Sequence, residues 1–391
     1  MSSAMPGTPP TARKVRVLIV DDSAVMRELL RRILSRDPEL EVVGSAPDPI
    51  AAEARIPLDR PDVLTLDVDM PRMDGLTFLE RLMATNPLPV VMVSALTQRG
   101  CETAMRALEL GAVDVLAKPK FDVEHGTRAM AADIVAVVKA AGAARPRRGV
   151  RARPTGPAAP NPQAVRPPSS TSTPRPVVPA RPSIPAPGPD AGSRHVVAIG
   201  ASTGGTEALL EVLQHLPEDT PGTVIVQHMP AGFTKAFANR LDRSCKVRVK
   251  EAEHGDPVVR GTVLIAPGDR HMTVEREGGR FVVHLNDGPP VGYHKPAVDV
   301  LFDSVARRLG ANAIGVILTG MGADGAAGLV AMRRAGAHTV AQDEATSVVY
   351  GMPREAAARG GAESVEPLHQ IAGTITRWVA ELRRGGGRQA A

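Results

Sequence analysis

The chain runs VRVLIVDDS from Val15 to Ser23. An apolar run without alternation is typical of a strand buried on both faces of a parallel sheet, and the two carboxylates mark its end. Apolar residues then recur at helical spacing from Val25 to Leu34, which predicts a helix directly after the strand. A strand that leads into a helix is the repeating unit of a doubly wound α/β fold.

The same alternation of strand and helix continues to about residue 140. Further strands are predicted at residues 42–43, 63–66, 90–93 and 113–117. Most of the predicted strands stop at polar side chains, which are Asp21, Asp22, Asp67, Ser94 and Lys118. Because the carboxyl ends of parallel strands lie at one edge of a sheet, we expect these side chains to gather there.

Three carboxylates in one place repel one another unless a positive charge offsets them. A set of oxygen ligands favours a hard divalent cation, so we predict Mg²⁺ at Asp21, Asp22 and Asp67. A carboxylate beside Mg²⁺ can attack phosphorus and become an acyl phosphate. Lys118 would balance the added charge, and Ser94 would hydrogen-bond a phosphate oxygen. Taken singly, Asp22 or Ser23 can instead cap a helix, Asp67 can cap a turn, and Lys118 can be a solvated lysine.

A second region of strands and helices begins at residue 196. The apolar run Val196–Ile199 leads into GASTGGT at residues 200–206, and apolar residues at helical spacing follow. Such a turn points backbone N–H groups and the positive end of a helix toward a ligand. Thr206 stands where a P-loop needs lysine, and Ser202 stands where a dinucleotide loop needs glycine. The spacing Gly-x-Ser-x-Gly around Ser202 matches a nucleophile elbow, although so short a pattern also arises by chance.

A serine nucleophile needs a base and an orienting acid. His228 follows the predicted strand 223–227, and Asp324 lies in a glycine-rich loop after the predicted strand 314–318. Both would therefore meet Ser202 at one sheet edge, whereas singly His228 can be a turn residue and Asp324 a solvated acid. The order Ser, His, Asp differs from that of the α/β-hydrolases, chymotrypsin and subtilisin. Other histidines of this region lack such a placement: His254, His271, His284 and His294.

Composition excludes several classes of protein. The chain has 391 residues, 43% of them apolar and only 2% aromatic, which suits two or three soluble domains. No apolar run reaches the roughly 18 residues of a membrane span, and residues 1–10 do not read as a secretory signal. Two distant cysteines argue against a disulfide scaffold or a cysteine-based zinc site. We therefore expect a cytoplasmic protein without direct membrane insertion.

The net charge of +5 is concentrated in one proline-rich segment. Between Arg145 and Arg194 the chain has nine arginines, no lysine and one acid, so the remainder is mildly acidic. This argues against nucleic acid as a partner of the folded parts. Residues 141–193 hold repeated proline and few large apolar side chains, which predicts a flexible, disordered linker. Residues 1–13 and 385–391 are also predicted to be disordered.

The first region resembles a response-regulator receiver domain. The matching stretches are VDDS at 20–23, LDVDMPRMDG at 66–75, VSA at 93–95 and AKP at 117–119. The resemblance covers residues 14–140 and implies a flavodoxin-like fold in which a CheA-type histidine kinase phosphorylates Asp67. It also implies that Asp21, Asp22 and the backbone carbonyl of Asp69 bind Mg²⁺. Ser94 and Lys118 would transmit the switch.

The second region resembles the chemotaxis-type protein-glutamate methylesterase domain of the CheB family. The matching stretches are IGASTGGT at 199–206, QHMP at 227–230, YHKPAVDVLF at 293–302, LTGMGADG at 318–325 and YGMP at 350–353. The resemblance implies a Rossmann-like domain over residues 194–384. Ser202 would be its nucleophile, His228 its base and Asp324 its orienting acid. Thr203 and the backbone of Met321 would line the site or hold the oxyanion.

Together the two resemblances imply a phosphorylation-activated enzyme. It would hydrolyse glutamyl methyl esters on methyl-accepting chemotaxis receptors and deamidate specific receptor glutamines, with no cofactor for the esterase chemistry. Ala323 stands where the family usually has asparagine, and the linker is longer than in well-known members. We expect the unphosphorylated receiver to cover the site.

Two other functions compete with this interpretation. One is a phospho-regulated adaptor that binds receptors without hydrolysing them. The other is a DNA-binding response regulator, which predicts a basic recognition helix after the linker, and the sequence offers none there.

Overall fold

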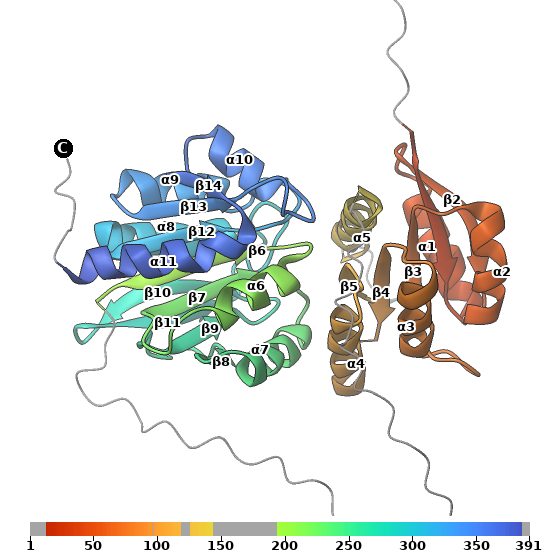
Figure 1. Cartoon of the computed structure of the whole chain (residues 1–391), viewed down its shortest axis with the longest axis horizontal. Coiled ribbons are helices and arrows are strands. Elements are labelled where there is room, and N and C mark those ends of the chain that lie inside the picture. Colours follow the sequence, from red (N-terminus) through yellow and green to blue (C-terminus); the bar gives the residue numbers. More distant parts are fainter. Residues whose placement is uncertain (1–12, 96, 119–125, 144–193, 385–391) are drawn as a thin grey trace, which may run out of the picture.

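The computed structural model describes residues 13–95, 97–118, 126–143 and 194–384. The segments predicted to be disordered lie almost entirely outside these residues, and this includes nearly all of the linker. The described residues form two α/β units, called here the N-terminal domain (13–143) and the C-terminal domain (194–384) (Figure 1). None of the helices in the described part of the chain has the length and apolarity that crossing a bilayer requires.

The N-terminal domain contains a five-stranded parallel sheet in the order β2-β1-β3-β4-β5. The strands are β1 (Val15–Val20), β2 (Leu40–Ala46), β3 (Val63–Asp67), β4 (Val90–Ser94) and β5 (Asp114–Ala117). The helices are α1 (Ala24–Leu34), α2 (Pro49–Asp59), α3 (Gly75–Thr85), α4 (Gln98–Glu109) and α5 (Gly126–Ala143). The predicted doubly wound fold is confirmed, and β2 is longer than the sequence pattern indicated. The strand order changes direction between β1 and β3, where folds of this type bind their ligands.

Helices cover both faces of this sheet. Helices α1 and α5 pack on one face, and α2, α3 and α4 pack on the other. Each of the first four helices begins at a side chain that accepts a hydrogen bond from a helical N–H, and these residues are Ser23, Asp48, Asp74 and Thr97. Such caps satisfy backbone donors that the helix itself leaves without a partner. Of the two residues predicted as alternative caps of the first helix, Ser23 takes this role and Asp22 does not.

The C-terminal domain contains a seven-stranded parallel sheet in the order β14-β13-β12-β6-β7-β9-β8, and a separate antiparallel hairpin, β10-β11. Its strands are β6 (Val196–Ala201), β7 (Gly222–Gln227), β8 (Arg248–Glu251), β9 (Thr262–Ile265), β10 (His271–Glu277), β11 (Arg280–Asn286), β12 (Ala313–Ile317), β13 (His338–Gln342) and β14 (Ser364–Glu366). Its α-helices are α6 (Gly205–Gln214), α7 (Phe233–Ser244), α8 (Val298–Leu309), α9 (Ala326–Arg334), α10 (Met352–Ala358) and α11 (Leu368–Arg383). The second predicted doubly wound domain is confirmed.

The centre of this sheet positions the candidate site. Strands β12, β6 and β7 are neighbours and are buried along their whole length. Helices α6, α7 and α11 pack on one face, while α8, α9, α10 and the hairpin pack on the other. The loops after the three central strands therefore meet at one edge of the sheet.

Glycines begin two of the helices that start at this edge. Gly204 precedes α6 with φ 74° and Gly325 precedes α9 with φ 84°, and neither helix has a side-chain cap. Residues other than glycine rarely adopt this left-handed conformation. A Cβ atom on Gly204 would also lie only 2.5 Å from Cβ of Val348. Glycine thus lets the chain turn sharply from strand to helix and brings the loop close to its neighbours.

The packing of α8 generates a prediction for stability. Phe302 is fully buried on this helix, whereas its neighbour Asp303 is exposed. We expect Phe302→Ala to lower the free energy of unfolding by about 3–5 kcal/mol, because it removes a buried ring and leaves a cavity. Asp303→Ala is the matched control and should change it little.

The measurement is urea unfolding followed by tryptophan fluorescence. The chain has one tryptophan, Trp378, which is buried on α11 and therefore reports on the C-terminal domain alone. Equal unfolding midpoints for the two variants would contradict the assigned packing of α8.

Candidate phosphorylation and active sites

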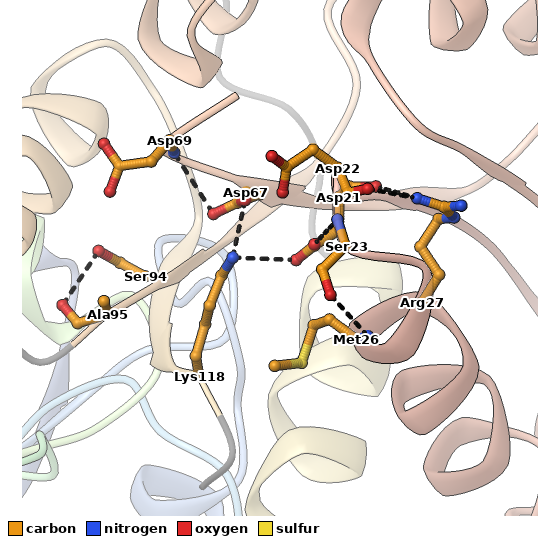
Figure 2. Close-up of polar contacts among 10 residues, drawn as sticks. All are labelled: Asp21, Asp22, Ser23, Met26, Arg27, Asp67, Asp69, Ser94, Ala95 and Lys118. Carbon is orange, nitrogen blue, oxygen red and sulfur yellow. Dashed lines mark hydrogen bonds and ion pairs between the residues drawn. The ribbon is translucent and has the colours of Figure 1, made fainter. Parts of the chain in front are cut away.

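The carboxyl edge of the N-terminal sheet brings three acids and a lysine together (Figure 2). Lys118 Nζ lies 2.7 Å from Asp67 Oδ2 and 3.3 Å from Asp21 Oδ2. Asp21 and Asp67 are buried, whereas Asp22 is exposed. One carboxylate oxygen from each of the three acids lies within 4.8 Å of the others. These residues come from the ends of β1, β3 and β5, the positions that the topology places side by side.

The chemistry of this cluster fits Mg²⁺. Burial raises the pKa of Asp67 to about 6, although the hydrogen bond from Lys118 acts to lower it. Burial also raises the pKa of Asp21. Two buried carboxylates this close are costly to ionise with a single lysine as compensation, and a hard divalent cation would supply the missing positive charge. Asp69 is adjacent, because its N–H donates a hydrogen bond to Asp67 Oδ1 at 3.4 Å.

A glycine lets α3 approach the candidate phosphorylation site. Gly75 N donates a hydrogen bond to the carbonyl of Val68 at 2.9 Å. A Cβ atom on Gly75 would lie 2.1 Å from the carbonyl oxygen of Asp67, so a larger residue would push the helix away from the strand end. The turn between Asp67 and Gly75 is thereby held against β3.

Ser94 lies at the same edge but points toward the backbone. Its hydroxyl donates hydrogen bonds to the carbonyls of Gly100 at 3.2 Å and Ala95 at 3.4 Å, and the second is drawn in Figure 2. Serine hydroxyls readily bond to nearby backbone in this way. In this arrangement the Ser94 hydroxyl bonds the first turn of α4 through the carbonyl of Gly100. The part of Ser94 in a switch stays a prediction.

In the C-terminal domain, Ser202 follows β6 and is half-buried. Its N–H donates to the carbonyl of Thr319 at 3.0 Å, and its carbonyl accepts from Gln227 Nε2 at 2.9 Å. The loop after β12 and the last residue of β7 therefore both bond the backbone of Ser202. Gly320 also lies against it, since a Cβ atom there would be 2.7 Å from Cβ of Ser202.

His228 follows β7 and pairs with Asp324. His228 Nε2 lies 2.8 Å from Asp324 Oδ2, and both side chains are more than nine-tenths buried. The backbone N–H of His228 donates to the carbonyl of Ala201 at 3.1 Å, so the histidine is adjacent to the serine in the sheet. The structure thus brings the three predicted residues to one edge.

Asp324 also caps a helix to which it does not belong. Its Oδ2 accepts from the N–H of Val298 at 2.7 Å and its Oδ1 accepts from the N–H of Asp299 at 2.9 Å. These are the first two residues of α8, whose N-cap residue Ala297 offers no side-chain hydrogen bond. Burial acts to raise the pKa of Asp324, but the hydrogen bonds from His228 and α8 lower it below its usual value. The carboxylate is therefore held ionised and fixed in direction.

In this orientation of His228, one ring nitrogen bonds Asp324 and the other does not. A carboxylate accepts hydrogen bonds, so we assign the proton of the neutral ring to Nε2. Nδ1 is buried and has no hydrogen-bond partner among the described residues. In the chymotrypsin triad the acid binds Nδ1 of the histidine, whereas here the acid lies at Nε2.

Thr203 and Met321 lie on the two loops that flank Ser202. Thr203 is buried, and its carbonyl accepts from Thr319 Oγ1 at 3.0 Å. The Thr203 hydroxyl donates a hydrogen bond to the carboxyl group of Asp114, on β5 of the N-terminal domain. Met321 follows Gly320, the residue that contacts Ser202.

His294 is a residue of this site that the sequence reasoning missed. Its ring stacks on that of His228, with centroids 3.9 Å apart and planes inclined by 9°. Burial and the charge of His228 lower the pKa of His294 to about 4. His294 follows no strand of the main sheet, so the rule that located His228 could not find it. The only available signal was its place in the stretch YHKP at 293–296.

The N-terminal domain packs beside the candidate active site. Helix α4 contacts α7, and Figure 1 shows α4, α5 and β5 on the side of the N-terminal domain that faces the C-terminal domain. Arg240 of α7 is 4% exposed and lies 3.3 Å from Glu109 of α4 and 2.7 Å from Glu207 of α6. Burial raises the pKa of Asp114, the partner of Thr203, to about 7. The two domains therefore share an ion-pair network and a hydrogen bond at the serine loop.

Comparison with known proteins accounts for both domains. The family model described as CheB methylesterase matches residues 197–375, and the model described as response regulator receiver domain matches residues 17–129. A solved structure, the CheB methylesterase catalytic domain of Thermotoga maritima, is 40% identical, covers 48% of this chain and 98% of its own, and has a TM-score of 0.46.

Curated relatives match along nearly the whole chain. A protein-glutamate methylesterase/protein-glutamine glutaminase of Ralstonia nicotianae is 54% identical over 92% of this chain and 94% of its own. A protein of the same name, numbered 2, from Pseudomonas aeruginosa is 50% identical over 95% of this chain and 99% of its own. This chain therefore belongs to the CheB methylesterase family, with a response regulator receiver domain ahead of its methylesterase domain.

Proposed function

We propose that this chain is a phosphorylation-controlled protein-glutamate methylesterase with Ser202 as nucleophile, His228 as base and Asp324 as orienting acid. The observation that carries the proposal is the buried pair of His228 and Asp324, whose carboxylate is fixed by the first turn of α8. Ser202 lies on the neighbouring strand end. A nucleophile, a base and an anchored acid at one edge are the parts that ester hydrolysis through an acyl-enzyme needs.

In the first half of the reaction, Ser202 Oγ attacks the carbonyl carbon of the glutamyl methyl ester. Its proton passes to His228 Nδ1, the ring nitrogen that is not bonded to Asp324. Asp324 stabilises the resulting imidazolium without taking the proton. The bond to the methoxy oxygen then breaks, and His228 returns the proton so that methanol leaves.

In the second half, water attacks the acyl-enzyme and His228 again takes and returns one proton. The products are a glutamate carboxylate and the restored Ser202 hydroxyl. Backbone donors near Thr203 and Met321 would stabilise the oxyanion of each tetrahedral intermediate. Thr203 adjoins the nucleophile, and Met321 lies in the loop that contacts it. The esterase chemistry needs no cofactor in this scheme.

We propose methyl-accepting chemotaxis receptors as the substrate, whereas the names of the relatives give protein glutamate and glutamine residues as the groups acted on. The same residues would deamidate receptor glutamines, because attack on a side-chain amide follows the same steps and releases ammonia instead of methanol. The phosphodonor would be a CheA-type histidine kinase. We place this chain in the cytoplasm, where it would meet the kinase and the cytoplasmic side of the receptors.

The acidic cluster of the receiver would hold Mg²⁺ through Asp21, Asp22, Asp67 and the backbone carbonyl of Asp69. When bound, the ion offsets the charge of the carboxylates and of a phosphoryl group. Asp67 is the proposed phosphorylation site, because it is buried at the switch point between β1 and β3. Lys118 would pair with the new phosphoryl oxygens in place of the two carboxylates it now contacts.

The contacts between the domains support a covered, unphosphorylated state. Asp114 accepts a hydrogen bond from the hydroxyl of Thr203, the residue after the proposed nucleophile, and Glu109 forms an ion pair with the buried Arg240. Glu109 is the last residue of α4 and Asp114 is the first residue of β5, the strand that leads to Lys118 at the phosphorylation site. We propose that the acyl phosphate repacks this region and releases Thr203, which shifts the chain toward an open state.

Replacement of the nucleophile tests the catalytic assignment. We expect Ser202→Ala to lower methanol release from methylated receptor membranes at least about a thousandfold, because no acyl-enzyme can form. Ser244→Ala, which alters an exposed serine at the end of α7, is the matched control. Full hydrolysis by the Ser202 variant would contradict the assignment. Receptor binding without hydrolysis by the unaltered protein would favour the adaptor function.

Replacement of the phosphorylation site tests control by the receiver. We expect Asp67→Asn to abolish the stimulation of methanol release by a small-molecule phosphodonor with Mg²⁺, since an amide cannot form the acyl phosphate. The matched control is Asp37→Asn, because Asp37 also faces a lysine, Lys139, at 3.4 Å. Normal stimulation of the Asp67 variant would rule out this site.

Weakening the domain interface tests the covered state. We expect Glu109→Gln to raise methanol release without phosphodonor about fivefold, because the covered state then leaves the charge of buried Arg240 less well paired. Glu28→Gln is the matched control, since Glu28 is an exposed acid that pairs with Arg32 at 2.9 Å on α1. If Glu109→Gln left the unstimulated rate unchanged, this contact would not restrain the enzyme.

A further inference from the structure

Two contacts hold the imidazole ring of His228, a hydrogen bond at its edge and an aromatic stack on one of its faces. Asp324 holds the Nε2 edge through a hydrogen bond of 2.8 Å, and His294 covers one face at a centroid distance of 3.9 Å. A single hydrogen bond tolerates considerable tilt of the donor ring. A parallel aromatic contact restricts that tilt, because the ring cannot turn without losing van der Waals contact or clashing. The two contacts together determine where Nδ1 points.

The loop that carries His294 is closed at its base by a second histidine. His271 is 2% exposed, and its two ring nitrogens bind the two ends of the segment 289–297. Nε2 contacts the carbonyl of Pro289 at 3.0 Å, and Nδ1 accepts from the N–H of Ala297 at 3.2 Å. A buried neutral imidazole with both nitrogens bonded fixes the separation of the two chain ends.

The tip of the same loop is a tight turn. Val291 and His294 exchange two backbone hydrogen bonds, each of 3.0 Å. The two residues between them, Gly292 and Tyr293, have φ angles of 57° and 72°. Positive φ at both central positions is the pattern of a type I′ turn, and it is unfavourable for a tyrosine. The loop keeps this strain at a position where the next residue contacts the catalytic base.

His294 is suited to stand beside a base that becomes charged. Burial and the neighbouring His228 lower its pKa to about 4, so it is neutral near pH 7. A neutral ring adds no positive charge next to the imidazolium that forms on His228. The ring also removes water from one face of that imidazole.

We propose that His294 is a positioning residue for the reaction. Its ring holds the plane of His228 so that Nδ1 faces Ser202, and the clamp of His271 and the 291–294 turn hold His294 in place. This inference rests on the proposed function, because it assigns His294 a role only through the base. The role requires an aromatic ring of similar size and does not require the ring nitrogens.

The test compares two replacements of His294 in the full chain under saturating phosphodonor and Mg²⁺. The reaction followed is methanol release from methylated receptor membranes. We expect His294→Ala to lower kcat about 100-fold with little change in KM, because misplacement of the base affects the transition state and not substrate binding. His294→Phe keeps a flat aromatic ring and should restore most of kcat.

A matched control comes from the other histidine pair of this domain. His254 and His284 have centroids 4.6 Å apart and planes inclined by 32°. His284→Ala removes one ring of that pair and should leave kcat and KM unchanged. Unfolding followed by Trp378 fluorescence shows whether each variant keeps the folded domain.

Four results would overturn the inference. The first is a kcat of His294→Ala equal to that of the unaltered chain, and the second is a loss of kcat in His294→Phe as large as in His294→Ala. The third is an effect of His294→Ala on KM alone. The fourth is a loss of kcat in His294→Ala that unfolding fully explains, together with a His294→Phe variant that is folded and inactive. Absence of methanol release from the unaltered chain is a different failure. It would overturn the proposed function and remove the reaction that His294 is inferred to serve.

Discussion

One carboxylate connects the helices, the sheet and the chemistry of the C-terminal domain. Asp324 accepts hydrogen bonds from two N–H groups of α8 and from His228. The helix needs an acceptor because its own N-cap is an alanine, and the histidine needs a fixed partner to act as a base. Both needs are met by one buried group, whose ionised form is stabilised by the helix. Loss of this group would disturb the start of α8 and the orientation of His228 together.

The two domains use similar topology for different chemistry. In the receiver, side chains cap helices α1 to α4, and the strand ends carry carboxylates suited to a cation and a phosphoryl group. In the methylesterase domain, α6 and α9 begin at glycines with positive φ. The sharp turns at Gly204 and Gly325 bring the loops of Ser202 and Asp324 against their neighbours. Parallel sheets thus collect functional residues at one edge, and the local turns decide which reaction the edge supports.

Two acids of the receiver contact the C-terminal domain, and one of them contacts the loop of Ser202. Arg240 is buried between an acid of its own domain, Glu207, and an acid of the receiver, Glu109. Asp114 contacts Thr203, which is adjacent to Ser202. A buried arginine is costly without good partners, so the stability of this contact depends on the position of α4. The proposed rearrangement of the receiver would therefore change contacts that include the loop of Ser202.

The sequence by itself determined both doubly wound domains and the residues that end their strands. Asp67, Ser202, His228 and Asp324 could be predicted because continuous apolar runs identify parallel strands, and topology brings the ends of such strands together. Only the tertiary structure decided which nitrogen of His228 meets Asp324, which helix Asp324 caps, and that His294 stacks on His228. His294 lies in a loop and Asp114 begins a strand, so neither follows the rule of strand ends. Their positions depend on packing between segments far apart in the chain, which local patterns do not encode.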